Sequence, residues 1–194
     1  MRTGVFGGTF DPIHNGHLAI ARAAKEEAAL DRVLFVVAAN PPHKKDNRLT
    51  AAPLRVQMTE AAIAEERGFQ ISLIEIERRG YSFTVDTLKS LGEEDPGGEL
   101  FFILGYDSAL DLPHWRDARL ILDLATLLVA PRPFCADPLP ALLRDRAILL
   151  KTEPWDISSS DIRSRIRKNE QTDHLLPPSV LDIIRKKRLY QPCP

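Results

Sequence analysis

Two histidines stand three positions apart, close to a glycine pair. They belong to the segment Gly7-Gly8-Thr9-Phe10-Asp11-Pro12-Ile13-His14-Asn15-Gly16-His17. Residues three apart lie on one side of a helix, so a helix that begins here would bring the imidazoles of His14 and His17 near one another. Two imidazoles can hydrogen-bond phosphate oxygens and stabilise the charge that develops during a phosphoryl transfer. The spacing therefore predicts a site for phosphate chemistry.

The glycines of this segment join a short apolar run to a helical pattern. Residues 3–6 have the composition of a buried strand, and residues 16–30 have the apolar periodicity of a helix. Because Gly7 and Gly8 lack a Cβ, a phosphate could approach the backbone N–H groups, and the helix would offer its positive N-terminal end. The pattern is not Gly-x-Gly-x-x-Gly, and no Gly-Lys-Ser/Thr follows. A dinucleotide oxidoreductase and a P-loop NTPase are therefore both disfavoured.

A second pattern suited to phosphate lies far along the chain. The triplet Ser158-Ser159-Ser160 is followed by Ile162 and Arg163. Serine hydroxyls cap helix starts, and an arginine one turn later can hold phosphate oxygens beside the N–H groups at that start. The same residues also suit a plain N-cap with a solvated arginine. Beside the histidine pair, we interpret them as a polyphosphate site, and we interpret the further basic residues of this helix as a solvated face.

Alternating strands and helices must position these groups. Strands are expected at residues 3–6, 33–37, 71–76, 100–104, 126–129 and 147–150, with helices at 16–30, after Pro53, at 84–91 and at 115–122. This order predicts βαβ units and an α/β fold with a doubly wound parallel sheet, in which ligands bind at the carboxyl ends of the strands. We expect a single domain over residues 1–194, with residues 155–194 as a small C-terminal helical extension.

Composition excludes several other classes of protein. The 194 residues include 26 Lys and Arg against 27 Asp and Glu, and 44% are hydrophobic. These values are typical of a globular protein and give no basic excess for nucleic-acid binding. Two cysteines, Cys135 and Cys193, lack metal-type spacing, so neither a zinc site nor a disulfide scaffold is expected. No apolar run approaches the roughly 20 residues of a membrane span, and we expect a cytoplasmic protein.

The sequence resembles the bacterial nicotinate-nucleotide adenylyltransferases, which belong to the nucleotidyltransferase superfamily with a His-x-Gly-His motif. The resemblance extends over nearly the whole chain. It is carried by Gly8-Thr9-Phe10-Asp11-Pro12, His14-Asn15-Gly16-His17, Pro41-Pro42-His43-Lys44, Tyr81-Ser82-Phe83-Thr84-Val85-Asp86-Thr87-Leu88, Gly105-Tyr106-Asp107-Ser108 with Trp115, Arg132-Pro133, Ile157-Ser158-Ser159-Ser160-Asp161-Ile162-Arg163, Leu176-Pro177 with Val180, and Leu189-Tyr190. Phe83 departs from the family pattern, which has Tyr there, and Val37, Ala39 and Phe134 depart in loops.

The resemblance implies a Rossmann-like fold and a transfer of the adenylyl group of ATP to nicotinate mononucleotide, with no covalent enzyme intermediate. It implies three sets of site residues: His14, His17, Lys44 and Arg163 in catalysis; Gly7, Gly8, Thr9, Phe10, Gly105, Asp107, Ser159 and Ser160 on ATP; and Thr84, Trp115, Arg116 and Arg132 on nicotinate mononucleotide. Mg²⁺ would travel with ATP, held mainly by phosphate oxygens and water, and no dedicated protein metal site is expected.

Several alternatives stay open at this point. A phosphopantetheine adenylyltransferase would share the first motif, but it usually has Thr in place of His14 and lacks the patterns around Lys44 and Trp115. A cytidylyltransferase would use CTP, and a nicotinamide-mononucleotide adenylyltransferase would use the amide of the same base. A non-catalytic nucleotide sensor is the alternative from a different class. The sequence also leaves the oligomeric state open, a homo-oligomer included.

Overall fold

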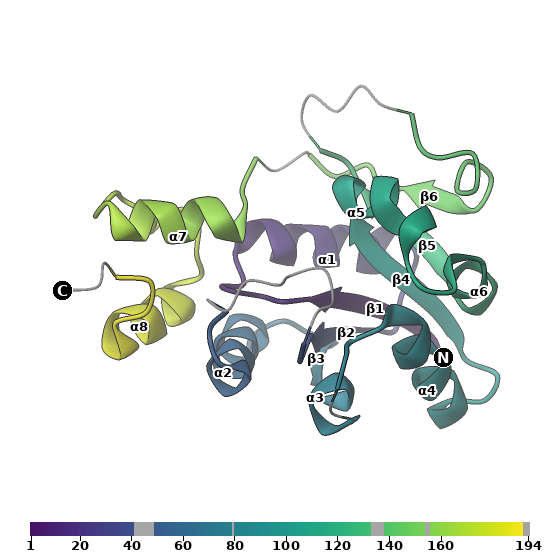
Figure 1. Cartoon of the computed structure of the whole chain (residues 1–194), viewed down its shortest axis with the longest axis horizontal. Helices are drawn as coiled ribbons and strands as arrows, with labels where there is room; N and C mark the ends of the chain where they lie inside the picture. The colour runs from purple at the N-terminus through teal and green to yellow at the C-terminus, as the bar shows by residue number, and fades with distance from the viewer. Residues whose placement is uncertain (41–48, 79, 133–137, 154–155, 192–194) are drawn as a thin grey trace.

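Six parallel strands form the central sheet of the computed structural model, which describes residues 1–40, 49–78, 80–132, 138–153 and 156–191 (Figure 1). The strands are β1 (Arg2–Gly8), β2 (Arg32–Val37), β3 (Phe69–Ser72), β4 (Glu99–Gly105), β5 (Thr126–Ala130) and β6 (Ala147–Leu149). Their order is β3-β2-β1-β4-β5-β6. The chain thus winds outward in one direction from β1 and in the other from β4. The predicted doubly wound, Rossmann-like fold is confirmed.

Helices cover both faces of this sheet. They are α1 (Asn15–Glu27), α2 (Ala52–Ile63), α3 (Ile74–Arg78), α4 (Thr84–Glu94), α5 (Tyr106–Asp111), the short 3₁₀ turn η1 (Leu112–His114), α6 (Ala118–Leu124), α7 (Ser159–Arg167) and α8 (Pro178–Lys187). Neighbouring strand residues belong to different cores: Phe6 packs with α1 and α2, whereas Val5 packs with α4 and α6. Two buried faces explain why the strands are continuous apolar runs.

The strand expected at residues 71–76 is wrong in its second half. β3 pairs with β2 only as far as Ser72, opposite Val36, and α3 begins at Ile74. Short apolar runs fit a strand or a buried helix equally well from periodicity alone. The helix is favoured here because it buries Glu75, whose carboxylate accepts a hydrogen bond of 2.7 Å from the hydroxyl of Thr87 on α4.

The helix expected at residues 115–122 is also misplaced. η1 ends before Trp115, which has an extended backbone at φ −75° and ψ 154°, and α6 starts only at Ala118. Pro113 lies within η1, and Asp117 adopts a left-handed conformation at φ 51°. These two residues break the helical path, so Trp115 and Arg116 stand in the connection between two helices. α5, which the sequence did not predict, precedes them.

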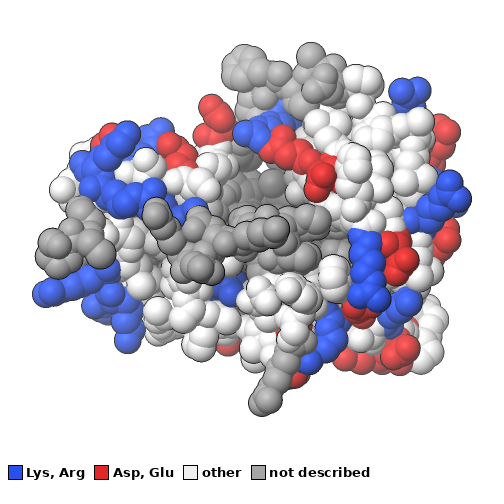
Figure 2. Space-filling view, in the orientation of Figure 1, with Lys and Arg blue, Asp and Glu red and all other residues white. Residues whose placement is uncertain are grey.

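The C-terminal helices pack beside the first motif. α8 lies against α2, and its Val180 and Ile184 share a core cluster with Ile162 of α7. The backbone N–H of Asn15, at the start of α1, donates to the carbonyl of Leu175 at 2.9 Å. In Figure 2, basic side chains gather over α7 and α8, at one end of the molecule. Among the described helices, none has the length and apolar character that a membrane span requires.

Candidate active site

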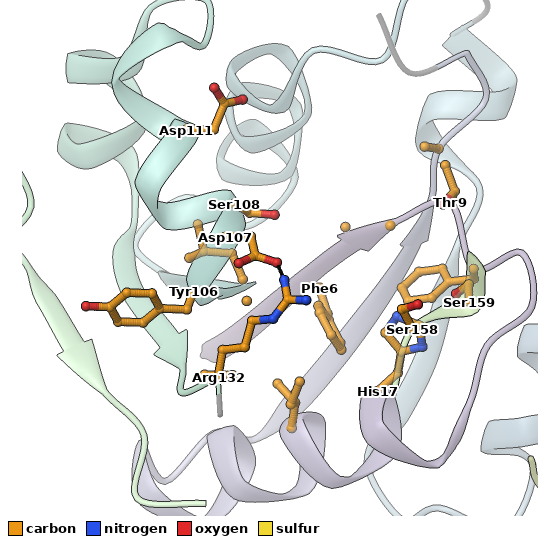
Figure 3. A pocket seen from close by; sticks show the side chains of 18 of the residues that line it. Phe6, Thr9, His17, Tyr106, Asp107, Ser108, Asp111, Arg132, Ser158 and Ser159 are labelled. Atoms are coloured by element: carbon orange, nitrogen blue, oxygen red, sulfur yellow. Dashed lines mark ion pairs between the residues drawn. The ribbon is translucent and has the colours of Figure 1, made fainter. Parts of the chain in front are cut away.

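A cavity of about 880 Å³ opens at the carboxyl ends of β1 and β4, where the winding direction changes. This is the place where α/β sheets of this type bind ligands. Fourteen of the residues expected from the sequence line it: Gly7, Gly8, Thr9, Phe10, His14, His17, Thr84, Gly105, Asp107, Trp115, Arg116, Arg132, Ser159 and Ser160. Figure 3 shows His17, Ser158 and Ser159 on one side and Asp107 and Arg132 on the other. Arg163, which was also expected at the site, is not among the residues that line the cavity, and Lys44 lies outside the described residues.

The two histidines of the motif stack on one another. Their ring centroids are 3.7 Å apart, with 28° between the planes. His14 is the N-cap of α1, and its backbone N–H donates to Nδ1 of His17 at 3.2 Å. Because Nδ1 accepts this bond, a neutral His17 carries its proton on Nε2. The two imidazoles therefore lie together, as the spacing of three predicts. The bond from His14 leaves Nε2 as the donor atom of a neutral His17.

Burial keeps His14 uncharged at neutral pH. Its side chain is 5% exposed, and its Nδ1 has no hydrogen-bond partner among the described residues. Loss of water around the ring lowers the pKa of His14 from 6.5 to about 4. At pH 7 the ring is therefore neutral, so any stabilisation it gives a phosphate comes from an N–H donor and not from a full positive charge.

This pKa predicts that mild acid destabilises the fold. The unfolded chain binds a proton near pH 6.5, but folded His14 does so only at about 4. Stability is therefore complete above pH 6.5 and declines as the pH falls toward 4, by about 2 kcal/mol between pH 7 and 5 from this residue. Urea unfolding of wild type and His14→Gln at both pH values measures this. The variant should lose less stability on acidification, and equal losses would contradict the neutral state.

The turn after β1 is shaped by Phe10. This residue is buried and left-handed, at φ 48°. Its ring lies edge-on to His17, with 5.1 Å between centroids, and would lie 2.9 Å from a Cβ placed on Gly8. A side chain at position 8 would therefore push the ring out of place. Phe10 thus supports His17 by packing, while Gly8 leaves the backbone accessible at the cavity wall.

Helix α7 is attached to this turn through its first residues. Ser158 is the N-cap, and its Oγ accepts from the N–H of Asp161 at 3.0 Å. The hydroxyl of Ser159 donates to the carbonyl of Pro12 at 2.9 Å. Arg163 donates through Nη1 to the carbonyl of Asp11 at 2.7 Å and through Nη2 to Oγ of Ser160 at 3.3 Å. These bonds tie the start of α7 to the segment before His14, and Ser159 and Ser160 line the same cavity as the two histidines.

Aromatic and basic side chains form the opposite wall. Trp115 packs edge-on against Phe102 and donates from Nε1 to Asp111 at 3.0 Å. The guanidinium of Arg116 lies 4.7 Å from the ring centre of Phe83. Helix α4 begins at Thr84, directly after Phe83. Phe83 is the N-cap of this helix, and its side chain makes no hydrogen bond to the backbone N–H groups of the first turn. This wall thus combines a flat apolar surface with the start of a helix, which favours negative charge.

Comparisons with known proteins agree with this geometry. Residues 5–165 match the family model described as cytidylyltransferase-like. The chain is 42% identical to the probable nicotinate-nucleotide adenylyltransferase of Desulfitobacterium hafniense strain Y51, over 98% of this chain and 96% of the relative. It is 39% identical to the corresponding protein of Clostridium botulinum strain Alaska E43, over 98% of both chains. The chain belongs to the nicotinate-nucleotide adenylyltransferase family.

Solved structures show the same fold at lower sequence identity. The Plasmodium falciparum nicotinic acid mononucleotide adenylyltransferase complexed with NaAD has a TM-score of 0.80 and 22% identity, with 97% of each chain covered. A putative nicotinate-nucleotide adenylyltransferase from Vibrio parahaemolyticus has a TM-score of 0.72 and 19% identity, covering 99% of this chain and 96% of that one. At such identities the likeness supports the fold alone.

Some cavity residues of this adenylyltransferase family member were not expected from its sequence. The sequence predicts a strand at Glu75 and a solvated face at Arg165, and it gives Tyr106 and Ser108 no site role although they belong to a family motif, yet all four line the cavity. Glu75 is only 7% exposed, and a buried carboxylate is a signal that the sequence could not give. Arg165 lies in the last turn of α7, four residues after Asp161, and its guanidinium pairs with that carboxylate at 2.8 Å.

Acidic side chains at the cavity are already engaged. Asp107 pairs with Arg132, and Asp111 accepts from Trp115. Within the described ranges, no three His, Cys, Asp or Glu side chains form a cluster that could hold a metal ion. This donor set fits a cation that keeps most of its ligands from phosphate and water, as Mg²⁺ does.

Proposed function

We propose that this chain joins ATP and nicotinate mononucleotide to give deamido-NAD and pyrophosphate. A phosphate oxygen of the mononucleotide would attack the α-phosphorus of ATP, and the bond from that phosphorus to the β-phosphate bridging oxygen would break. The observation that carries the proposal is the stacked pair His14 and His17, which lines one cavity together with Ser159 and Ser160 at the start of α7. Membership of the nicotinate-nucleotide adenylyltransferase family supports the same reaction.

The mechanism needs no protein nucleophile, because the acceptor phosphate is already anionic at neutral pH. Catalysis is then positioning and stabilisation of charge. His17 donates from Nε2 to an oxygen on the α-phosphorus, and neutral His14 supports it from behind by stacking. Ser159, Ser160 and Arg163 hold the leaving pyrophosphate at the start of α7. We assign Lys44 to the phosphates as well, from the family resemblance.

Further residues are assigned to the adenosine of ATP, and a metal ion accompanies its phosphates. The end of β1, at Gly7 and Gly8, and the turn after it, at Thr9 and Phe10, carry the nucleotide, with Gly105 and Asp107 near the adenosine. Mg²⁺ enters with ATP and neutralises phosphate charge when bound. We further propose that the enzyme works in the cytoplasm, because its two cysteines are too few for the disulfide scaffold that is typical of secreted domains.

The base is held on the opposite wall. We assign its ring to the face of Trp115 and its carboxylate to the backbone N–H groups at the start of α4, around Thr84. An amide there would bring its NH₂ against N–H donors and leave polar groups unpaired. Arg116, which pairs with Asp86 and Asp117, and Arg132, which pairs with Asp107, supply further hydrogen-bond donors on this cavity. A clear preference for nicotinate over nicotinamide mononucleotide follows from this arrangement.

Pyrophosphate release tests the reaction directly. Wild-type enzyme is supplied with ATP or CTP, together with nicotinate mononucleotide, nicotinamide mononucleotide or phosphopantetheine. Turnover should require ATP and nicotinate mononucleotide. Equal use of the nicotinamide compound would refute the assignment of the base, and nucleotide binding without any turnover would favour a sensor.

Replacing Trp115 separates affinity from selectivity. Trp115→Ala should raise KM for both mononucleotides by about tenfold, since a base–aromatic stack contributes roughly 1–3 kcal/mol, and should leave their ratio nearly unchanged. Trp115→Phe should recover much of the affinity because a ring remains. Steady-state kinetics with each mononucleotide measures both effects. If the alanine variant lost the preference together with the affinity, selectivity would belong to the placement of the base by the indole.

A further inference from the structure

A buried carboxylate lies directly beneath the proposed phosphate turn. Asp11 is 1% exposed, yet it lines no wall of the cavity. Its Oδ1 accepts a bond of 2.6 Å from the hydroxyl of Tyr190, and its Oδ2 accepts from the N–H of Thr50 at 3.2 Å. Its own carbonyl accepts from Arg163. One residue therefore connects the turn, the start of α2, helix α7 and the segment that follows α8.

A buried arginine completes the same network. Arg55 of α2 is 1% exposed and donates to the carbonyls of Thr9 and Thr50, each at 2.8 Å. Burial lowers the pKa of Arg55, and the carboxylate of Asp11 acts against that change. A charged group this deep is destabilising unless it is hydrogen-bonded and offset by opposite charge. Two buried charged side chains therefore fix the turn at residues 9–11. Arg55 binds the carbonyl of Thr9, and the carboxylate of Asp11 is held by Tyr190 and Thr50.

Tyr190 reaches this network from the far end of the chain. It lies 179 residues after Asp11 and takes a left-handed backbone, at φ 62°. Burial, helped by the hydrogen bond to Asp11, raises the pKa of Tyr190 well above its ordinary value. The hydroxyl therefore stays protonated at physiological pH and always acts as the donor. An ordinary apolar contact would hold the C-terminal segment equally well, but it would not fix the carboxylate.

We infer that Tyr190 is a positioning residue for the reaction: its hydroxyl holds Asp11 and, through it, the phosphate turn and Arg163. The inference rests on the proposed function, because it concerns the residues assigned to ATP. No atom of Tyr190 needs to touch a substrate. Removal of its hydroxyl leaves one oxygen of a buried carboxylate without its donor, and Asp11 must then shift toward another. The carbonyl that orients Arg163 moves with it.

Tyr190→Phe tests this with the smallest possible change, because the ring and its packing remain. We expect kcat/KM for ATP to fall by about 10- to 10²-fold, the range for small misplacement of reacting groups, while KM for nicotinate mononucleotide stays unchanged. The assays are run at a temperature at which circular dichroism shows both the wild type and the variant to be fully folded. Ser179→Ala is the matched control: its hydroxyl also ties the C-terminal segment to α2, by a 2.9 Å bond to the carbonyl of Ala61, but far from the turn.

The outcomes separate positioning from simple stabilisation. A lower Tm for Tyr190→Phe with unchanged kinetic constants would overturn the inference, as would equal kinetic losses in Ser179→Ala. Asp11→Ala, which removes the acceptor oxygens, should reduce kcat/KM for ATP as well, and the double variant should lose little more than Asp11→Ala alone, because both changes break one linkage. If the losses in kcat/KM of the two single variants multiplied in the double variant, the inference would also be overturned. Absence of turnover in the wild type would instead reject the proposed function. The inference about Tyr190 is judged only by comparing the variants with an active wild type.

Discussion

Replacement of His17 by alanine should lower kcat by about 10²-fold or more, in line with the loss of one preorganised donor to a transition-state oxyanion. The geometry gives the reason. Nδ1 of His17 is occupied by the backbone N–H of His14, so Nε2 carries the proton that we assign to the α-phosphate. The stack on His14 and the edge contact with Phe10 hold the ring in place before ATP binds.

Two further variants sharpen this experiment. His17→Gln places an amide N–H near the position of Nε2 and should recover part of the rate, whereas His174→Ala removes an exposed imidazole outside the cavity and should change nothing. Unfolding by urea should show His17→Ala to be only about 1 kcal/mol less stable, the usual size of a lost helix cap. Normal turnover in the folded alanine variant would reject the role of His17.

The second large effect concerns Arg163. Arg163→Ala should raise the Kd for ATP by about tenfold or more, because a guanidinium–phosphate pair is a strong, charge-assisted contact, and should leave the Kd for nicotinate mononucleotide nearly unchanged. Calorimetric titration of each ligand measures this directly. Arg163 lies one turn into α7 and donates to Oγ of Ser160, which lines the cavity.

The controls for Arg163 lie on the same helix. Arg167→Ala removes an equal charge one turn further on, in the last turn of α7, and should leave both affinities nearly unchanged. Arg163→Lys keeps the charge but loses the fork that binds two oxygens, so it should recover only part of the affinity. Equal weakening of both substrates by Arg163→Ala would show that the arginine only anchors α7 to the carbonyl of Asp11.

The fold could be predicted from the sequence largely because its strands have two buried faces. Continuous apolar runs such as residues 33–37 and 100–104 indicate parallel strands, and the glycines after the first of the strands indicate the ligand edge. The spacing of three between His14 and His17 predicts that their imidazoles lie near one another, because a helix begins between them. Local periodicity and local spacing were sufficient for these features.

Features decided by tertiary contacts could not be predicted in this way. Ile74 begins a helix because Glu75 finds a partner on α4, and that partner is visible only in the folded chain. Trp115 leaves the helical path because of its neighbours Pro113 and Asp117. The linkage of Asp11 to Tyr190 joins residues 179 positions apart, a separation at which no pattern in the sequence signals contact.

The same separation has a consequence for synthesis on the ribosome. Asp11 is made early, and Tyr190 follows 179 residues later, a delay on the order of 10 to 40 s at ordinary elongation rates. The strands of the sheet can emerge and pair during this interval, while the carboxylate of Asp11 still lacks its hydroxyl donor. A nascent chain would therefore form its sheet before Tyr190 fixes Asp11 and the phosphate turn. ATP in the surrounding solution would meet a finished phosphate turn only after Tyr190 has left the ribosome.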